Sequence, residues 1–270
     1  MNEEPIVTHE EAGDGYGVHP LSGAAARPAS TLSAPLSAEI NAALSASPKG
    51  EVAVRSLDLR IPLLEKNDIL AERNRGYFLG RGLSALNLVS SPGAGKTTLL
   101  ERTLDEFALT TKCAVLVGDL ETDNDGNRLR RPHVPVAQIT TGTVCHLDAG
   151  MIARAVQSIE LAGVRVLFIE NVGNLVCPAS FDLGEQVRVV LLSTTEGEDK
   201  PLKYPPIFKS ANLVLLTKVD LADALGFKRD VALQNVRRIA PQARVIEISA
   251  RSGEGVQEWY AFLRSLSPAP

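Results

Sequence analysis

The sequence has few cysteines, no excess of positive charge and no long apolar run, and each absence excludes a class of protein. Three cysteines in 270 residues are odd in number and too few for a disulfide framework, so we expect a reducing, cytoplasmic setting. A net charge of −4 argues against a general binder of nucleic acid or of anionic membranes, which would need a basic face. No apolar run approaches the roughly 20 residues of a spanning helix, and the start lacks the basic and apolar regions of a signal peptide.

Hydrophobic residues make up 44% of the chain, which is enough to bury one substantial core. Residues 1–50 are instead rich in Ala, Ser, Pro and Gly and have few large apolar side chains. Burial there cannot offset the entropy of ordering the chain, so we expect a disordered tail. The two histidines of this tail, His9 and His19, lie far apart and without cysteines, which favours solvated side chains over metal ligands.

Residues 51–84 are predicted to form a helical segment that precedes the main domain. Its large apolar residues recur at helical spacing and are Leu63, Leu64, Leu70, Tyr77 and Phe78. We expect an amphipathic helix that begins near Pro62 and ends at Gly80 or Gly82. Packing on the following domain is favoured over binding of a partner.

Residues 85–270 are predicted to form one α/β domain. Short apolar runs indicate buried strands at Leu86–Val89, Ala114–Val117, Val166–Ile169, Val187–Leu192, Leu213–Leu216 and Val245–Ile248. Helical stretches are predicted at Leu99–Leu109, Met151–Leu161 and Val256–Leu266. Strands that alternate with helices indicate a mostly parallel sheet covered by helices on both faces. Ligands of such sheets bind at the carboxyl ends of the strands.

A glycine-rich loop follows the first predicted strand and leads directly into a helix. Its sequence, SSPGAGKTT, departs from the G-x-x-x-x-G-K-[ST] pattern only at Ser90, where the pattern has glycine. Lys96 is expected to reach the terminal phosphates, and the hydroxyl of Thr97 to bind Mg²⁺. The predicted nucleotide contacts in this loop are Gly93, Ala94, Gly95, Lys96, Thr97 and Thr98. The alternative is an ordinary turn, but the strand, the Lys-Thr pair and the helix together favour a P-loop NTPase.

A second motif indicates the base. Thr217-Lys218-Val219-Asp220 follows a buried strand and is similar to the [NT]-K-x-D motif of GTPases. The carboxylate of Asp220 can accept hydrogen bonds from guanine N1–H and N2–H, which adenine does not offer. Ser249 and Ala250, at the end of the next strand, match the second base-contacting loop of such enzymes. Alone the motif is weak, since a lysine and an aspartate at a strand end are usually solvated. After a phosphate loop it favours guanine over adenine.

The strand at 166–169 leads into a candidate switch. Most GTPases have D-x-x-G at this place, and this chain has Glu170 and Gly173 at the same spacing. The substitution keeps a carboxylate near Mg²⁺ and a glycine whose N–H can sense the γ-phosphate. The residues predicted to act in hydrolysis are Lys96, Asp119, Glu170 and Gly173. No arginine finger is evident, so we expect slow turnover without a partner.

An acidic cluster at residues 118–125 has the position of a first switch. Asp119, at a strand end, and Asp123 are candidates for binding Mg²⁺ or the attacking water. Glu121 and Asp125 are interpreted as solvated side chains. The complete predicted magnesium set is Thr97, Asp119, Asp123 and Glu170.

The thiols include a candidate metal site. Cys145 and His146 are adjacent and precede a helix, and Cys177 follows the Glu170 switch by a few residues. Thiolate and imidazole bind Ni²⁺ and Zn²⁺ well, but three ligands leave one tetrahedral position for a second subunit, a carboxylate or water. Buried inert cysteines are the common alternative. Cys113, at the start of a strand, is predicted to lie in the core and His133 on the surface.

Long strings of this sequence resemble the HypB family, the SIMIBI-class P-loop GTPases of hydrogenase nickel incorporation. The matching strings are VSSPGAGKTTLL, GDLETDND, TGTVCHLDAGMI, FIENVGNLVCPASFDLGE, TEGEDKPLKYP and TKVDL, with Trp259 near the end. The resemblance implies a homodimer that depends on nucleotide and metal and hydrolyses GTP to GDP and phosphate. It implies nickel delivery to the [NiFe]-hydrogenase large-subunit precursor, together with a HypA-like accessory protein.

The resemblance also assigns residues. It implies that Cys145, His146 and Cys177 form a switch-coupled nickel site, with Zn²⁺ possible at the same ligands. It places Lys200, in the loop EGEDK, near the nucleotide and the dimer contact. One departure is clear, because many members begin with a C-x-x-C-G-C motif or a histidine-rich stretch and residues 1–50 have neither. High-affinity nickel binding or storage by the tail is therefore not expected.

Three other interpretations fit part of the pattern. A metallochaperone GTPase similar to UreG, which serves urease, shares the phosphate loop, but the strings CHLDAGM and GNLVCPASFDLGE favour HypB. A P-loop phosphotransferase would act on a small molecule, and the T-K-V-D and Ser-Ala pair argues against it. A non-catalytic nickel-binding module would bind nucleotide only for structure.

Overall fold

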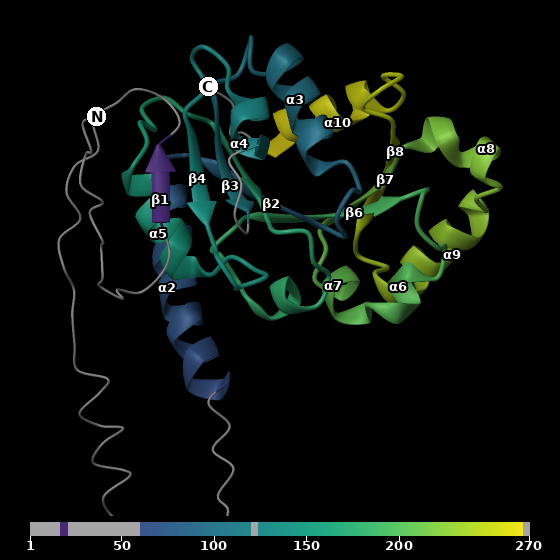
Figure 1. Cartoon of the computed structure of the whole chain (residues 1–270), viewed down its shortest axis with the longest axis horizontal. Helices are drawn as coiled ribbons and strands as arrows, with labels where there is room; N and C mark the ends of the chain where they lie inside the picture. The colour runs from purple at the N-terminus through teal and green to yellow at the C-terminus, as the bar shows by residue number, and fades with distance from the viewer. Residues whose placement is uncertain (1–16, 21–59, 120–123, 267–270) are drawn as a thin grey trace, which may run out of the picture.

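The structure is a computed structural model that describes residues 17–20, 60–119 and 124–266. These residues form one eight-stranded sheet with helices on both faces (Figure 1). The strands are β1 (Gly17–Pro20), β2 (Ser84–Ser90), β3 (Cys113–Asp119), β4 (Val136–Thr140), β5 (Val166–Glu170), β6 (Val187–Ser193), β7 (Leu213–Thr217) and β8 (Arg244–Ile248). The α-helices are α2 (Arg60–Gly80), α3 (Lys96–Glu106), α4 (Asn124–Leu129), α5 (Ala149–Gln157), α6 (Lys200–Lys203), α7 (Pro205–Lys209), α8 (Ala222–Leu225), α9 (Arg229–Ile239) and α10 (Val256–Leu266), with 3-10 turns η1 (Cys177–Ser180) and η2 (Val219–Leu221).

The sheet has the order β1-β4-β3-β5-β2-β6-β7-β8. Strands β2 to β8 are parallel, and β1 pairs antiparallel with β4 at one edge. This confirms the predicted α/β class with a mostly parallel sheet. All six predicted strands form, and β4 is an additional strand that the apolar runs did not reveal, because Gln138 and Thr140 interrupt its short sequence. The phosphate-loop helix α3 ends at Glu106, three residues before the predicted end.

Alternate residues of each strand point to opposite faces and build separate cores. On one face, Leu86, Leu88 and Leu191 pack with α3 and α10, around the fully buried Trp259. On the other face one core lies under α2 and α5, and another lies under α7 and α9. Because β2, β3, β5 and β7 are parallel, their carboxyl ends lie at the same edge of the sheet, and the predicted motifs lie there.

Helix α2 exists as predicted but buries a different face. In Figure 1 it lies beside α5, and it packs against that helix. Leu63 and Tyr77, predicted to face the domain, are 56% and 37% exposed. The prediction of an apolar stripe is therefore wrong at these positions.

The buried positions of α2 include two asparagines, Asn67 and Asn74. Asn74 Nδ2 donates to Ala149 O at 2.9 Å and to Leu183 O at 3.0 Å. Asn67 Oδ1 accepts from Ala149 N, again at 2.9 Å. Buried amides that bond to backbone groups satisfy the polar atoms of distant loops, so polar residues replace the expected apolar ones.

The predicted tail lies almost entirely outside the described residues. Its described part, Gly17–Pro20, forms β1, so the expectation of disorder does not hold for these four residues. The backbone bonds of β4 explain the difference, because a sheet edge can pair with a segment of any composition. Within the described part of the chain, no helix is both long and apolar enough to cross a membrane.

Candidate functional site

The phosphate loop lies between β2 and α3 and has the conformation that its glycines predict. Gly93 and Gly95 have φ angles of 72° and 99°, in the region that favours glycine. Lys96 is buried, and its Nζ donates to Ser90 Oγ at 2.9 Å. The serine that departs from the motif therefore supplies an acceptor for the motif's lysine. Burial lowers the pKa of Lys96, and the nearby carboxylate of Glu170 opposes this shift.

A cavity of about 500 Å³ lies in front of this loop. The predicted nucleotide and magnesium residues that line it are Gly93, Gly95, Lys96, Thr97, Thr98, Asp119, Glu170, Gly173 and Lys218. Asp123 was predicted here too, but it lies outside the described residues. Asp125, interpreted from sequence as a solvated side chain, instead lines the cavity. Its Oδ1 lies 3.4 Å from Arg128 Nη1.

Thr97 and Glu170 form the core of the predicted magnesium site. Thr97 Oγ1 donates to Glu170 Oε1 at 2.7 Å, and Glu170 Oε2 has no hydrogen-bond partner among the described residues. Burial raises the pKa of Glu170 to about 7, while Lys96 and the Thr97 hydroxyl act in the opposite direction. A buried carboxylate with one unpaired oxygen, beside a hydroxyl and the carboxylate of Asp119, fits the hard oxygen ligands that Mg²⁺ prefers.

Gly173 brings the switch into contact with the phosphate loop. A Cβ atom at this position would lie 3.0 Å from Pro92 Cα and 3.1 Å from Pro92 N. Any larger residue would therefore push against the backbone of the loop. The close approach explains the glycine and means that a shift of either segment displaces the other.

A second cavity of about 250 Å³ adjoins the first. The predicted base-binding residues that line it are Thr217, Lys218, Asp220, Ser249 and Ala250, and Ala94 of the phosphate loop lines it as well. Gly95, Thr98 and Lys218 line both cavities, which places the two end to end. Thr217 Oγ1 donates to Ala94 O at 2.8 Å and so ties the base motif to the phosphate loop.

Lys200 lies near the phosphate loop but outside the lining of both cavities. Its Nζ is 3.2 Å from Glu196 Oε2 and 3.3 Å from Ser91 Oγ, and it lies over the ring of Tyr204. Ser91 in turn donates to Glu196 Oε2 at 2.8 Å. Within one chain, the lysine is thus positioned beside the loop and not against the phosphate cradle itself.

The predicted metal ligands converge in space. One ligand atom each from Cys145, His146 and Cys177 lie within 4.8 Å of one another, and the two sulfurs are 3.1 Å apart. The ring of His146 stacks on Phe181 with centroids 3.9 Å apart, and its Nδ1 has no partner among the described residues. Burial lowers the pKa of His146, with Asp148 opposing, which favours the neutral imidazole that binds metal.

The two residues predicted to lie outside this cluster do so. Cys113 is 1% exposed in the core, and burial raises the pKa of its thiol to about 12, so it is not a reactive thiolate. His133 is exposed, as predicted.

Asn171 joins the switch to the metal cluster. It follows Glu170 directly, and its Oδ1 accepts from Leu147 N at 3.2 Å and from Val172 N at 2.9 Å. Its Nδ2 donates to Asn87 Oδ1 at 3.2 Å. One buried amide therefore holds both the residue after His146 and the residue before Gly173.

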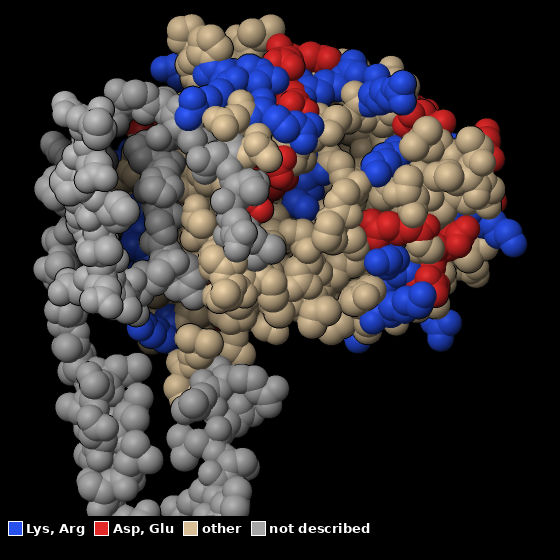
Figure 2. All heavy atoms as spheres, in the orientation of Figure 1, with Lys and Arg blue, Asp and Glu red and all other residues tan. Residues whose placement is uncertain are grey.

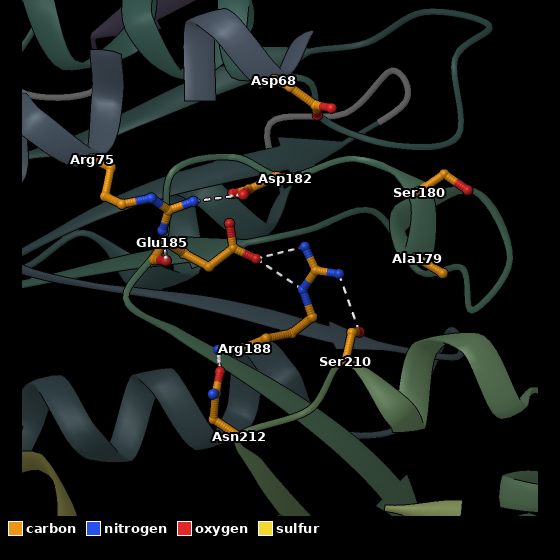
Figure 3. Close-up of a pocket in the computed structure, with 9 residues that line it drawn as sticks. All are labelled: Asp68, Arg75, Ala179, Ser180, Asp182, Glu185, Arg188, Ser210 and Asn212. Carbon is orange, nitrogen blue, oxygen red and sulfur yellow. Dashed lines mark hydrogen bonds and ion pairs between the residues drawn. The ribbon is translucent and has the colours of Figure 1, made fainter. Parts of the chain in front are cut away.

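A buried ion pair continues this network on the same side of the sheet (Figure 3). Asn87 Nδ2 donates to Glu185 Oε1 at 3.2 Å, and Arg188 Nη2 is 2.6 Å from that same oxygen. Arg188 also donates to the carbonyl of Phe181, whose ring supports His146. Arg75 of α2 is paired with Asp182 in the same region (Figure 3). These ion pairs and hydrogen bonds hold the segment at Phe181 and Asp182, which lies next to the metal cluster.

No sequence motif marks this network of buried polar side chains. Its members are Asn87, Asn171, Glu185 and Arg188. A signal was available, since a polar residue interrupts each of two otherwise apolar strands, in LNLV and in VRVV. These polar positions do not reveal which side chains they pair with, because the paired residues come together only when the sheet forms.

Fold and site together define a P-loop nucleotide-binding protein with a thiol–imidazole cluster next to its switch. The profile of the family "CobW/HypB/UreG, nucleotide-binding domain" matches residues 84–247. The hydrogenase maturation factor HypB of Escherichia coli K12 is 52% identical over 211 residues, which cover 78% of this chain and 73% of that protein.

Solved structures agree with these matches. The crystal structure of HypB from Archaeoglobus fulgidus has a TM-score of 0.71 at 40% identity, covering 76% of this chain and 100% of that one. HypB from Helicobacter pylori, solved in complex with nickel, has a TM-score of 0.70 at 38% identity, covering 76% and 98%. The chain belongs to the HypB family of hydrogenase maturation factors, as its sequence strings predicted.

Arg188→Met is expected to reduce the free energy of unfolding by about 3 kcal/mol, because it leaves the Glu185 carboxylate buried without its cation. Urea denaturation measures the change. The control is Lys203→Met, which removes the exposed pair with Asp199 and is expected to have little effect. An equal decrease in the free energy of unfolding in the two variants would contradict a structural role for the buried pair of Glu185 and Arg188.

Proposed function

We propose that this protein binds and hydrolyses GTP and that it carries nickel for insertion into the large-subunit precursor of [NiFe]-hydrogenase. One observation supports the combination above all others. Glu170 is the last residue of β5, and the loop that follows it passes Gly173, at the phosphate loop, and reaches Cys177, in the metal cluster. A chain segment of eight residues therefore contributes to both sites.

The nucleotide half of the proposal rests on the two adjoining cavities. Lys96 would pair with the terminal phosphates while the backbone around Gly93 and Gly95 turns its N–H groups toward them. Asp220 and Ser249 line the neighbouring cavity, where Asp220 would accept from guanine N1–H and N2–H. The pairing of a phosphate loop with this carboxylate supports GTP over ATP and argues against a phosphotransferase.

The magnesium residues would be Thr97, Glu170 and Asp119, with Asp123 proposed in addition. Bound Mg²⁺ would offset negative charge on the β- and γ-phosphates. Asp119 is also a candidate for orienting the attacking water, and the N–H of Gly173 for sensing the γ-phosphate. GTP is cleaved to GDP and phosphate, at a rate that we expect to be slow in the isolated protein.

Nickel is the proposed cargo. Cys145, His146 and Cys177 supply soft sulfur and borderline nitrogen ligands, which suit Ni²⁺ and also Zn²⁺. The remaining coordination position would be filled by a second subunit, a carboxylate or water. We propose a homodimer that forms with nucleotide and metal, in which Lys200 contributes a cation near the subunit contact. A HypA-like protein and the hydrogenase precursor are the proposed partners, in the cytoplasm.

A metallochaperone GTPase that serves another enzyme, as UreG-like proteins serve urease, is the nearest alternative. It would use the same two sites, so the client alone separates it from the main proposal. A nickel-binding module with structural nucleotide would differ more, because it would bind GTP without releasing phosphate.

Phosphate release from GTP tests the enzymatic half. The protein with Mg²⁺ is expected to hydrolyse GTP and not ATP, and Lys96→Ala to lower the rate by on the order of 100-fold or more, because the terminal phosphates lose their buried cation. Lys209→Ala, at an exposed lysine of α7, is the control and should match the original protein. Equal hydrolysis of ATP, or an unchanged rate of GTP hydrolysis in Lys96→Ala, would contradict the GTPase assignment.

Nickel binding tests the metal half. Cys177→Ala and Cys145→Ala are expected to weaken Ni²⁺ binding by about 10-fold or more, since each removes one of three ligands. GTP affinity should change little in either variant. Cys113→Ala is the matched control, because it removes a buried thiol that is not part of the cluster's donor set. Isothermal titration with nickel alone gives the affinities, and retention of full affinity in Cys177→Ala would contradict the site.

A further inference from the structure

One arginine lines the phosphate cavity without a role in the reaction described so far. Arg128 comes from α4 and lies in the lining with Lys96, Thr97 and Glu170. No motif marks it in the sequence. The packing of α4 against α3, the helix of the phosphate loop, brings it there.

Arg128 is held at the start of α3. Its Nη2 donates to Glu101 Oε2 at 2.6 Å and to Thr98 Oγ1 at 3.2 Å, and its Nη1 lies 3.4 Å from Asp125 Oδ1. Thr98 follows Thr97 directly and lines both the phosphate and the base cavities. The guanidinium therefore lies beside the turn of α3 whose N–H groups face the phosphates.

The contacts of Arg128 allow it to change partner. Its side chain is 44% exposed, and its ion pairs are with the partly exposed carboxylates of Glu101 and Asp125. Exposed ion pairs contribute little free energy, so a doubly charged phosphate can compete with Glu101 for the guanidinium. Figure 2 shows basic side chains gathered over α3 and α4 with acidic ones among them.

The charge of the cavity favours this exchange. Among the described residues of the lining, Lys96, Arg128 and Lys218 are cations, and Asp119, Asp125 and Glu170 carry carboxyl groups. A triphosphate with one Mg²⁺ brings net negative charge into this cavity. Substitution of Arg128 would remove one of the three described cations that can offset that charge.

Arg128 and Glu170, the carboxylate proposed to hold Mg²⁺, line the same cavity. The guanidinium therefore faces the space in which the phosphates and Mg²⁺ would lie. Its planar fork can donate two parallel hydrogen bonds to phosphate oxygens, which a lysine cannot.

We propose that Arg128 is a catalytic residue of GTP hydrolysis, an arginine finger supplied by the same chain. The inference rests on the proposed GTPase function. Water attacks the γ-phosphorus, and the bond from that phosphorus to the β,γ-bridging oxygen breaks with its electron pair left on GDP. Inorganic phosphate retains the water's oxygen and one of its protons, and the other proton is released to solvent. Arg128 leaves Glu101 and donates hydrogen bonds to the phosphate oxygens that gain charge as the bond breaks. It keeps its own protons throughout.

Arg131 provides a matched control. It lies three residues after Arg128, past the end of α4, and pairs with Asp105 of α3 much as Arg128 pairs with Glu101. It is not part of the lining of the phosphate cavity. Replacing either arginine with alanine removes an ion pair with α3. Only the replacement of Arg128 also removes a cation from the cavity.

The test measures GTP hydrolysis and GDP affinity of the full chain with Mg²⁺. Arg128→Ala is expected to lower kcat by on the order of 100-fold and to leave GDP affinity within about threefold, because the contact forms as the bond breaks. Arg128→Lys should retain part of the rate, since it keeps the charge but not the fork. Arg131→Ala should match the original protein in both measurements.

Each other result overturns the proposal in a recognisable way. A kcat in Arg128→Ala within about twofold of the original, with hydrolysis still dependent on Lys96, rejects Arg128 and leaves the GTPase assignment in place. Parallel losses of GTP and GDP affinity at unchanged kcat would make Arg128 a binding residue only and reject the catalytic role. Absence of Lys96-dependent phosphate release in the original protein would reject the GTPase assignment and the arginine finger together.

Discussion

The hydrogen bonds of Asn171 fix the point at which the nucleotide site and the metal cluster meet. Its amide accepts from the backbone on both sides, at Leu147 and at Val172, and donates to Asn87 in the neighbouring strand. The residue is 1% exposed, so none of these bonds is easily replaced by water. Glu170 precedes it and Gly173 follows it, which places the carboxylate proposed to bind Mg²⁺ and the proposed switch glycine on either side of one anchored residue.

Tight packing on both sides of this anchor limits how the loop can move. Gly173 touches the phosphate loop at Pro92, and Asn174 Nδ2 donates to the carbonyl of Cys145 at 3.3 Å. A displacement of the loop by nucleotide would therefore be transmitted to the segments that carry Cys145 and Cys177. We infer that nucleotide state and metal geometry are coupled through this segment, and by thermodynamic reciprocity nickel would in turn change nucleotide affinity.

Local chemistry made much of the site predictable. A phosphate loop, a base motif and a carboxylate with a following glycine each lie at a strand end, so Lys96, Asp220 and Glu170 could be placed before the sheet was seen. The convergence of Cys145 with Cys177 was predicted through the family resemblance, because spacing alone does not bring two loops together. The fold class followed from the alternation of apolar runs with helical stretches.

The remaining features depend on long-range partners. Helix α2 buries Asn74 because its amide donates to two distant backbone carbonyls, at the start of α5 and in the loop before β6, which a helical apolar pattern cannot reveal. Arg188 lies within a strand opposite a carboxylate that is buried with it, and Arg128 enters the phosphate cavity only through the packing of α4 on α3. Polar residues in apolar contexts were visible in the sequence, but their roles required the tertiary structure.

Nickel affinity in the two nucleotide states tests the coupling most directly. The full chain would be titrated with Ni²⁺ in the presence of GDP and, separately, of a non-hydrolysable GTP analogue, each with Mg²⁺. The shared loop predicts dissociation constants that differ by about fivefold or more, in keeping with typical coupling free energies. Identical affinities in the two states would contradict the account, because the switch and the metal cluster would then act independently.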